Sequence, residues 1–276
     1  MIAFLVLTSA GLAIVFGMMR VINLAHGEFV MLGGYITLFC TSRWGWNIYA
    51  SMLIAAPIFV GLAGLIIERV VIRFLYGRIL DTMLATWGLS LTLIGLVTLA
   101  FGTSALGVAT PIPGYSLGAY QMGGYNLFII AVAVVLVGLL WTVLRFTRLG
   151  LIARGAMQSA DIASSLGYNP RTVYMWTFTA GAALSGLAGG VLAPLTGLLP
   201  SSGGAYIAKA FITVITGGAA VIAGTLSSSI IFGTVNQLVS FASTPVIGEI
   251  VMLACAIILL RLMPQGITAR FFRSST

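Results

Sequence analysis

Charged side chains are scarce in this sequence. Only 7% of its 276 residues are Asp, Glu, Lys or Arg, whereas a soluble domain carries about 25%. So few charges cannot cover a surface in water, which excludes a soluble enzyme, a disordered protein and a nucleic-acid-binding domain. The 13 basic and 5 acidic residues give a formal net charge of +8. The basic residues are spread among apolar segments, as in loops beside a membrane.

Residues that bind phosphate or metal ions are equally few. Lys209 is the only lysine, so no Gly-x4-Gly-Lys-Ser/Thr loop can form, and any ATP-driven step needs another subunit. His26 is the only histidine, and no Cys or His pair has the spacing of a zinc site, so neither a metal nor a cofactor is expected in this chain. Cys40 and Cys255 both lie inside apolar runs and are predicted to be free thiols.

Long apolar segments are abundant. Hydrophobic residues make up 60% of the chain, and the mean hydropathy is +1.13. A membrane-spanning helix needs about 20 such residues, and the runs lack the alternation of barrel strands. We therefore predict an all-α polytopic membrane helix bundle of about eight spans, plus or minus one, as a single domain over residues 1–276. The runs are 1–19, 29–42, 48–67, 82–101, 125–144, 172–193, 207–222, 224–241 and 247–263.

Three of these runs need comment. The first begins at Met1 without a basic segment ahead of it, so we expect a retained helix and not a signal peptide. The run 29–42 is short, which favours a re-entrant or tilted element. The runs 207–222 and 224–241 are separated only by a glycine-rich junction that contains Gly217, Gly218 and Gly224. Broken helices of this kind often line substrate sites in transporters.

The arginines predict the orientation of the bundle, because cytoplasmic loops carry an excess of positive charge. Residues 102–124 contain no charged residue, so this segment is expected outside, where Arg43 and Lys209 are exceptions. Gly114 is therefore predicted outside, and Gly77 and Ser165 in the cytoplasm. Three groups of arginines are assigned to the cytoplasm, together with the C-terminus: Arg69, Arg73 and Arg78; Arg145, Arg148, Arg154 and Arg171; Arg261, Arg270 and Arg273.

Asn23, His26 and Glu28 are polar residues between the first two apolar runs. One interpretation is a solvated turn at the membrane interface. The other is a polar cluster on a translocation path, because ionisable groups inside membranes usually face a cavity. An intramembrane enzyme is disfavoured, because residues two apart do not share a helix face and no nucleophile lies nearby in the sequence.

A short helix of small residues is predicted over 156–166, with Gly167 as the left-handed residue that ends it. Asn169 then caps the next helix, and Pro170 occupies its first position. The short helix is either an ordinary amphipathic surface helix or a docking helix for a partner protein. It has too few charges for a solvated face and too few large apolar residues to anchor in lipid, which favours docking.

Small residues recur four apart in the run that starts at residue 172. Gly181, Ser185 and Gly189 share one face of a helix, which allows very close approach of another helix. We predict tight packing within the bundle at this face.

Several motifs together resemble the LivH-type permease subunits of bacterial ABC importers for branched-chain amino acids and amides. The most specific is GMMRVINLAHGEFVMLGGY at residues 17–35. The others are Glu68-Arg69, Leu75-Tyr76-Gly77-Arg78, Leu84 to Leu89, Leu149-Gly150, Ala163 to Gly167, Pro170 to Phe178 and Pro264-Gln265-Gly266. The resemblance extends over almost the whole chain.

The resemblance implies an ATPase-coupling role for the predicted docking helix. The general importer signature is Glu-Ala-Ala-x3-Gly, and Asp161-Ile162-Ala163-x3-Gly167 has the same spacing, with isoleucine in place of the central alanine. The residues assigned to coupling are Ala156, Asp161, Ile162, Ala163, Leu166 and Gly167.

The resemblance also implies the assembly and its location in the bacterial inner membrane. We expect a second homologous permease of the LivM type, two cytoplasmic ATPases that bind ATP and Mg²⁺, a periplasmic substrate-binding protein and no nucleic acid. This chain would form half of the translocation path for branched-chain amino acids. A urea or short-chain amide importer is the alternative within the class. The alternative outside the importer class is a passive small-solute channel. Asn169-Pro170-Arg171 resembles one half of the water-channel motif.

Overall fold

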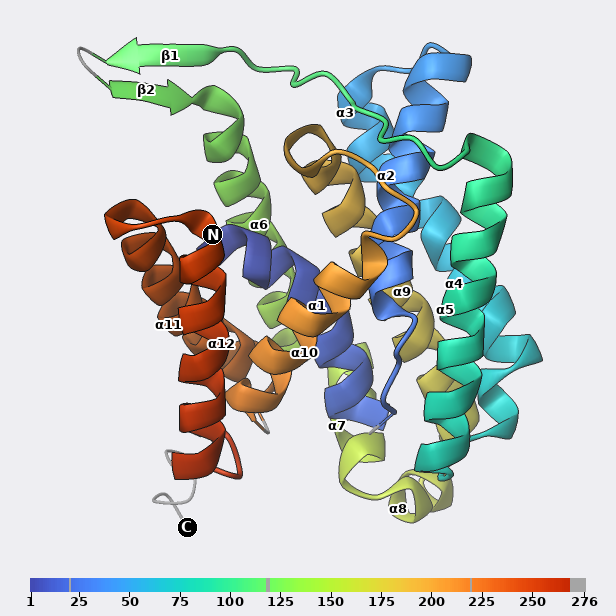
Figure 1. Cartoon of the computed structure of the whole chain (residues 1–276). Coiled ribbons are helices and arrows are strands. Elements are labelled where there is room, and N and C mark those ends of the chain that lie inside the picture. The colour runs from blue at the N-terminus through green and yellow to red at the C-terminus, as the bar shows by residue number, and fades with distance from the viewer. Residues whose placement is uncertain (20, 118–119, 219, 269–276) are drawn as a thin grey trace.

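The computed structural model describes residues 1–19, 21–117, 120–218 and 220–268 (Figure 1). Arg270, Arg273 and the C-terminus, whose side of the membrane was predicted, lie outside these residues. The helices are α1 Ile2–Met19, α2 His26–Arg43, α3 Ile48–Ala50, α4 Ala56–Val70, α5 Ile79–Phe101, α6 Gly124–Phe146, α7 Arg148–Gln158, α8 Ala160–Ser165, α9 Pro170–Thr196, α10 Gly203–Gly217, α11 Val221–Ala242 and α12 Pro245–Leu262. A π-helical segment, Ser51–Ala55, joins α3 to α4, and a 3-10 turn, Ile72–Phe74, follows α4.

The prediction of an all-α membrane bundle is confirmed. In the described part of the chain, seven helical stretches are long and apolar enough to cross a membrane. They are α1, the continuous stretch Ile48–Phe74, α5, α6, α9, α11 and α12. Besides these, α2 lies buried inside the bundle, and α10 is a shorter apolar helix.

Two boundaries differ from the sequence prediction. The second helix begins at His26 and not at residue 29, so His26 and Glu28 form its first turn. Residues 102–124, for which no helix was predicted, contain a small antiparallel hairpin of β1 Gly114–Leu117 and β2 Tyr120–Gly123. The hairpin stands at one end of the bundle, beyond the helices (Figure 1).

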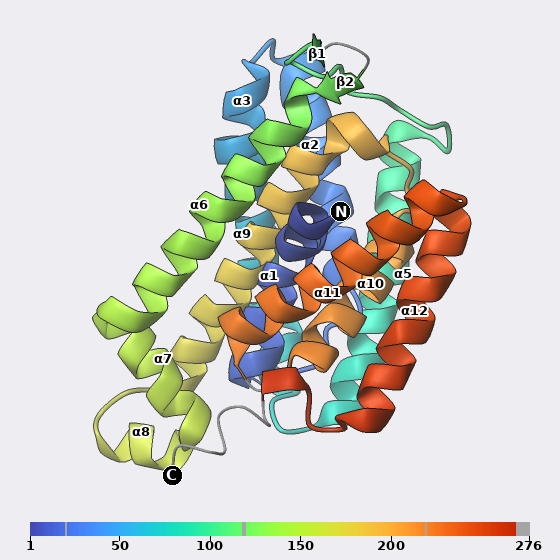
Figure 2. The same cartoon turned by 90° about the vertical axis from the view of Figure 1, so that its left-hand side faces the viewer.

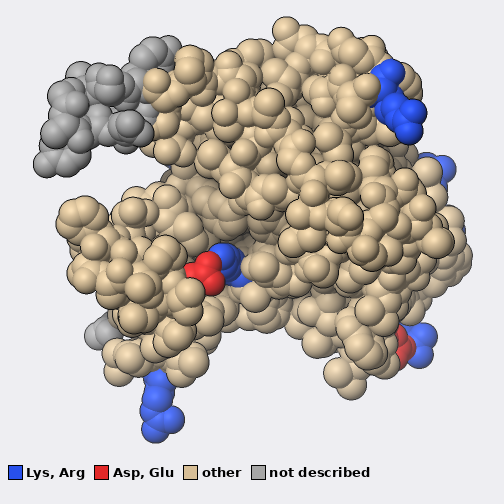
Figure 3. All heavy atoms as spheres, turned by 45° about the horizontal axis from the view of Figure 1, so that its top comes forward, with Lys and Arg blue, Asp and Glu red and all other residues tan. Residues whose placement is uncertain are grey.

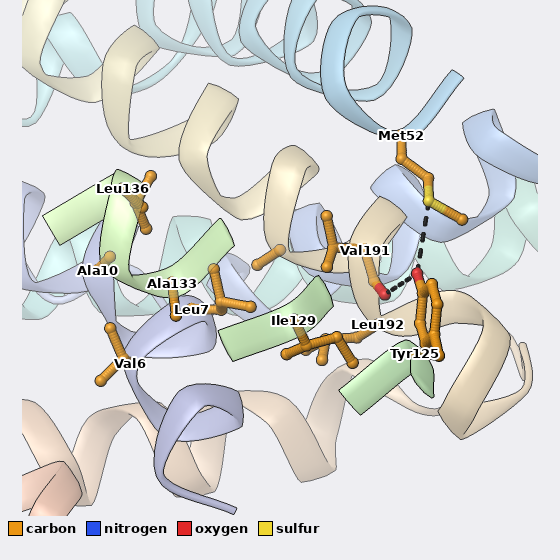
Figure 4. Packing of buried hydrophobic residues seen from close by; sticks show 11 residues of the cluster. Val6, Leu7, Ala10, Met52, Tyr125, Ile129, Ala133, Leu136, Val191 and Leu192 are labelled. Atoms are coloured by element: carbon orange, nitrogen blue, oxygen red, sulfur yellow. Dashed lines mark hydrogen bonds between the residues drawn. The ribbon is translucent and has the colours of Figure 1, made fainter. Parts of the chain in front are cut away.

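Helix α9 is at the centre of the bundle. It packs against α1, α2 and α4, and Figure 2 shows it lying between α6 and the other helices. Its small residues make this possible, because side chains of ordinary size would hold the neighbouring backbones apart. At its outer face, the buried hydroxyl of Tyr125 on α6 donates a 2.7 Å hydrogen bond to the carbonyl oxygen of Val191 (Figure 4).

The two ends of the bundle differ in charge. We call the end with Arg69, Arg73 and Arg78 the basic end; there Nε of Arg69 lies 3.5 Å from Sδ of Met175, near the start of α9. We call the opposite end, with the hairpin, the charge-poor end. There the backbones of Leu106 and Leu198 form an isolated β-bridge. The structure thus separates the arginine-rich loops from the uncharged segment 102–113, as the sequence predicted.

The chain re-enters the bundle before α2 and again before α10. After α1 it runs from the basic end back into the molecule, and α2 starts at a buried position (Figure 1). After α9 it turns inward from the charge-poor end before α10 begins (Figure 1). The two starts meet, since a Cβ atom on Gly27 would lie 1.9 Å from the carbonyl oxygen of Gly203.

Candidate functional site

The segment between α1 and α2 is held by hydrogen bonds to its own backbone and to α5. Oδ1 of Asn23 accepts a 3.0 Å hydrogen bond from the backbone N–H of Ala25. The backbone N–H of Leu24 donates to Oγ1 of Thr86 at 3.1 Å. Asn23 is buried. These bonds replace the helical pairing that the re-entrant backbone lacks.

The His26 imidazole connects three helices. Its Nε2 lies 2.7 Å from the carbonyl oxygen of Thr8 on α1, and its Nδ1 lies 3.2 Å from Oγ of Ser185 on α9. Because a carbonyl only accepts, we assign the proton to Nε2, which donates to the carbonyl oxygen of Thr8. The Ser185 hydroxyl donates a 2.8 Å hydrogen bond to the carbonyl oxygen of Gly181.

The Glu28 carboxyl packs against the beginning of α10. A Cβ atom on Gly203 would lie 2.6 Å from Oε1 of Glu28, so a larger residue there would displace the carboxyl. The partial positive charge at a helix N-terminus favours an acidic group at this place. Oε2 of Glu28 has no hydrogen-bond partner among the described residues.

These three side chains are only 2% exposed. The interpretation as a solvated interfacial turn is therefore wrong, because Asn23, His26 and Glu28 are enclosed by α1, α5, α9 and α10. Their role on a translocation path stays a prediction. The structure adds that His26 and Glu28 each touch an element distant in sequence, through Ser185 and Gly203.

The small residues of α9 face two different neighbours. A Cβ atom on Gly181 would lie 2.9 Å from the carbonyl oxygen of Gly11 on α1, and one on Gly189 would lie 1.7 Å from that of Val30 on α2. Ser185 lies between them and is fully buried. Backbone contacts on this face therefore bring α1 and α2 against the same helix.

The junction between α10 and α11 is closely packed. A Cβ atom on Gly217 would lie 2.6 Å from the carbonyl oxygen of Gly224. Oγ1 of Thr268 donates a 2.6 Å hydrogen bond to the carbonyl oxygen of Gly217. Gly218 and Gly266 both have positive φ, and a Cβ on Gly266 would lie 2.4 Å from Cα of Gly218. The closing Pro-Gln-Gly segment thus fastens the end of the chain to this helix break.

The prediction of a single helix over 156–166 is wrong. Helix α7 extends to Gln158, the backbone at Ser159 is extended, and α8 begins at Ala160. The break occurs because Ser159 is an N-cap: its Oγ accepts a 3.3 Å hydrogen bond from the backbone N–H of Ile162. Serine competes well for this position and poorly for a helix interior, which the small-residue pattern did not reveal.

The end of α8 agrees with its prediction. Gly167 has a φ of +86°. The backbone N–H of Tyr168 donates to the carbonyl oxygen of Ala163, and that of Gly167 donates to that of Ser164, which is the pattern of a Schellman C-cap. Directly afterwards, Oδ1 of Asn169 caps α9 by accepting from Arg171 N at 3.0 Å. Only a few residues therefore separate α8 from the central helix.

The predicted coupling residues lie at the tip of the basic end (Figure 2). Ala156 and Ala163 are buried against the rest of the segment. Asp161 and Gly167 are exposed, and the side chains of Ile162 and Leu166 are 64% and 72% exposed. The exposed surface of α8 therefore combines one carboxylate with two large apolar side chains.

Two polar contacts were not predicted from the sequence. The Tyr76 hydroxyl donates to Oε1 of the buried Glu68, and burial raises the pKa of Tyr76, with the neighbouring carboxyl adding to the shift. Nζ of Lys209 on α10 lies 2.5 Å from Oε1 of Glu249 on α12. The sequence did contain a clue to the second contact. Lys209 and Glu249 are each an isolated charge within an apolar run, and such charges often pair with each other.

Comparison with known proteins identifies the family of this chain. Residues 1–260 match the family described as "Branched-chain amino acid transport system / permease component". The chain belongs to this permease family. No solved structure matches it.

Named relatives in the permease family cover nearly the same length. The high-affinity branched-chain amino acid transport system permease protein LivH of Escherichia coli is 28% identical, over 96% of this chain and 91% of the relative. The high-affinity branched-chain amino acid transport system permease protein BraD of Pseudomonas aeruginosa is 29% identical, over 96% of this chain and 91% of the relative. A probable branched-chain amino acid transport permease protein LivH of Methanocaldococcus jannaschii is 27% identical over 96% and 88%. This permease is accordingly a multi-pass membrane protein with a role in transport.

Proposed function

We propose that this chain is the permease subunit of an ATP-driven importer for branched-chain amino acids and forms half of the translocation path. The observation that carries the proposal is the family match over residues 1–260. The relatives reported above are named for branched-chain amino acids, which favours this substrate class over urea and short amides. It also favours an importer subunit over a passive channel.

The assembly that we propose contains four further subunits. A second, LivM-like permease completes the path, two ATPases bind ATP with Mg²⁺ in the cytoplasm, and a periplasmic protein delivers the substrate. The composition supports a separate source of ATP hydrolysis, because the only lysine lies in Ala208-Lys209-Ala210, outside any phosphate-binding loop. We place the basic end and the C-terminus in the cytoplasm, since positive charge favours that side.

Coupling would proceed through α8. Its exposed surface suits a cleft on an ATPase, with Ile162 and Leu166 as apolar contacts and Asp161 as the charged one. The Schellman turn at Gly167 and the cap at Asn169 fix α8 against the start of α9. Since α9 packs on α1, α2 and α4, a displacement of α8 is transmitted to the helices in the middle of the bundle.

The test begins with the full chain, tagged in its native host and purified from membranes with its partners. We expect two ATPases and a second permease to co-purify. In proteoliposomes supplied with the binding protein and internal ATP, labelled leucine should accumulate, and acetamide and urea should not. Leucine flux of equal size without ATP would contradict the importer and support a channel. Accumulation of urea in place of leucine would contradict the proposed substrate class.

A further inference from the structure

The Lys209–Glu249 ion pair joins the middle of α10 to the first turns of α12. Nζ of Lys209 lies 5.6 Å from the ring centroid of Phe4, so the ammonium is held by an aromatic face as well as by the carboxylate. The side chain of Lys209 is 20% exposed and that of Glu249 is 51% exposed. Among the described residues there is one other ion pair, Arg78–Asp81, and it lies at the basic end.

The surroundings of the pair are apolar. Helix α12 is a candidate membrane span, and Val246 and Ile250 near Glu249 are exposed. Lys209 lies six residues after the first residue of α10, which is about 9 Å along the helix axis. A charged pair that faced lipid beside a membrane-spanning helix would be costly, so its exposed side is expected to face water or a protein partner.

The surface of the molecule agrees with this expectation. A hollow separates the part formed by α11 and α12 from the rest of the molecule, and an adjoining acidic and basic group lie in it (Figure 3). By contrast, α5 and α6 expose many large apolar side chains, among them Leu91, Leu99, Val134 and Val135. These two helices suit contact with lipid, and the hollow suits the translocation path.

We propose that Lys209 and Glu249 form a binding site for the zwitterionic head of an amino acid on the translocation path. The substrate carboxylate would bind the Lys209 ammonium, and the substrate ammonium would bind the Glu249 carboxylate. In the empty path the two side chains neutralise each other, so that neither charge is left unpaired. Phe4, whose ring centroid lies 5.6 Å from Nζ of Lys209, offers apolar surface for an aliphatic side chain. Urea and simple amides carry no charges with which to replace this pair.

This inference rests on the proposed function, and the test separates the two. The purified complex in proteoliposomes is assayed for leucine imported per ATP hydrolysed. In Lys209→Met and Glu249→Gln we expect this ratio to fall at least tenfold, while the loaded binding protein still stimulates ATP hydrolysis. Asp81→Asn is the matched control, because it removes the other ion pair, and it should keep the wild-type ratio.

A charge-exchanged variant distinguishes a binding site from a structural tie. Lys209→Glu combined with Glu249→Lys restores an ion pair in reverse order. If the pair only holds α10 and α12 together, both the thermal stability and the amount of leucine imported per ATP hydrolysed should recover. The binding site predicts that stability recovers while the ratio stays low, because Phe4 still orients the aliphatic side chain for the original order of charges.

The wild-type protein offers a further measurement that no folding defect can affect. Lys209 is the only lysine, so an amine-reactive reagent modifies one side chain of this chain, which peptide mass spectrometry identifies. During turnover, L-leucine should slow modification of Lys209 at least threefold relative to D-leucine, which consumes the reagent equally. Three results would overturn the site and leave the proposed function standing. They are equal modification of Lys209 with L-leucine and D-leucine, a wild-type ratio of leucine to ATP in the single variants, and full recovery of that ratio in the charge-exchanged variant. Absence of leucine import by the wild type would overturn the function itself.

Discussion

The Ser185 hydroxyl lies 3.2 Å from Nδ1 of His26 and 2.8 Å from the carbonyl oxygen of Gly181. The first distance joins residues that are 159 positions apart in the sequence. With the Nε2 contact to Thr8, it ties the start of α2 to α1 and α9 at a place where these helices approach backbone to backbone.

We expect His26→Ala to destabilise the permease. The change removes the hydrogen bond from Nε2 to the Thr8 carbonyl and the contact of Nδ1 with Ser185, and a hydrogen bond of this kind contributes about 0.5–1.5 kcal/mol. Thermal unfolding of the purified complex measures this as a lower midpoint. Thr92→Val is the control, since the exposed Thr92 makes a single hydrogen bond within α5, and it should leave the midpoint nearly unchanged.

The same variant tests whether His26 lies on the path. If it does, leucine uptake per assembled complex falls as well, although ATPase binding is retained. Normal uptake per assembled complex, with only the midpoint lowered, would limit His26 to holding the helices together.

Gly189→Val should separate α2 from α9. The new side chain would start with a Cβ atom 1.7 Å from the carbonyl oxygen of Val30, so one backbone must move. Overpacking of this kind costs about 1–3 kcal/mol or more. The readout is the yield and the unfolding midpoint of the purified chain. Gly95→Ala on α5, where a Cβ meets nothing within 4 Å, should match the wild type, and a wild-type midpoint for Gly189→Val would contradict the close approach.

Gly167→Val should uncouple ATP hydrolysis from substrate. At a φ of +86°, a residue with a Cβ is strained by about 1–2 kcal/mol, and the turn that fixes α8 to α9 is disturbed. We expect lower transport and lower stimulation of the ATPase by loaded binding protein, with substrate binding to that protein unchanged. Gly45→Val is a matched control, since Gly45 follows the end of α2, has a φ of +63° and has open space around it, and it should leave coupling unchanged.

Asp161→Arg tests the same surface by charge. Reversal of an exposed interface charge should weaken or misplace the ATPase contact, because mismatched charges at interfaces can cost several kcal/mol. The measurement is ATPase activity of the reconstituted complex with and without loaded binding protein. Full stimulation in both Gly167→Val and Asp161→Arg would mean that α8 is an ordinary surface helix.

The orientation of the bundle is testable by single cysteines in a background without Cys40 and Cys255. Cysteines at Phe74 and Ser165 on the basic end should react with a membrane-impermeant maleimide only in inside-out vesicles. A cysteine at Gly114, at the charge-poor end, should react only in right-side-out vesicles. Labelling of Gly114 from the cytoplasmic face alone would reverse the proposed topology.

The sequence by itself determined the class of the protein and most of its helices. Scarce charge and apolar runs of membrane length leave a helical bundle as the favourable structure, because unpaired backbone groups are too costly in lipid. Local signals also predicted the glycine stop at Gly167 and the cap at Asn169, since both depend on neighbouring residues only. The break at Ser159 was missed although it is local, because the small-residue pattern over 156–166 was given more weight than the preference of serine for an N-cap.

Only the tertiary structure decided which polar residues meet. His26 contacts Ser185, Glu28 contacts Gly203, and Lys209 pairs with Glu249. In each case the two residues lie on helices that are not adjacent in the sequence. A hydropathy pattern records how apolar a segment is and carries no information about which face of it meets which neighbour. That choice depends on how closely glycine-bearing backbones can approach, and therefore on the packing of the whole bundle.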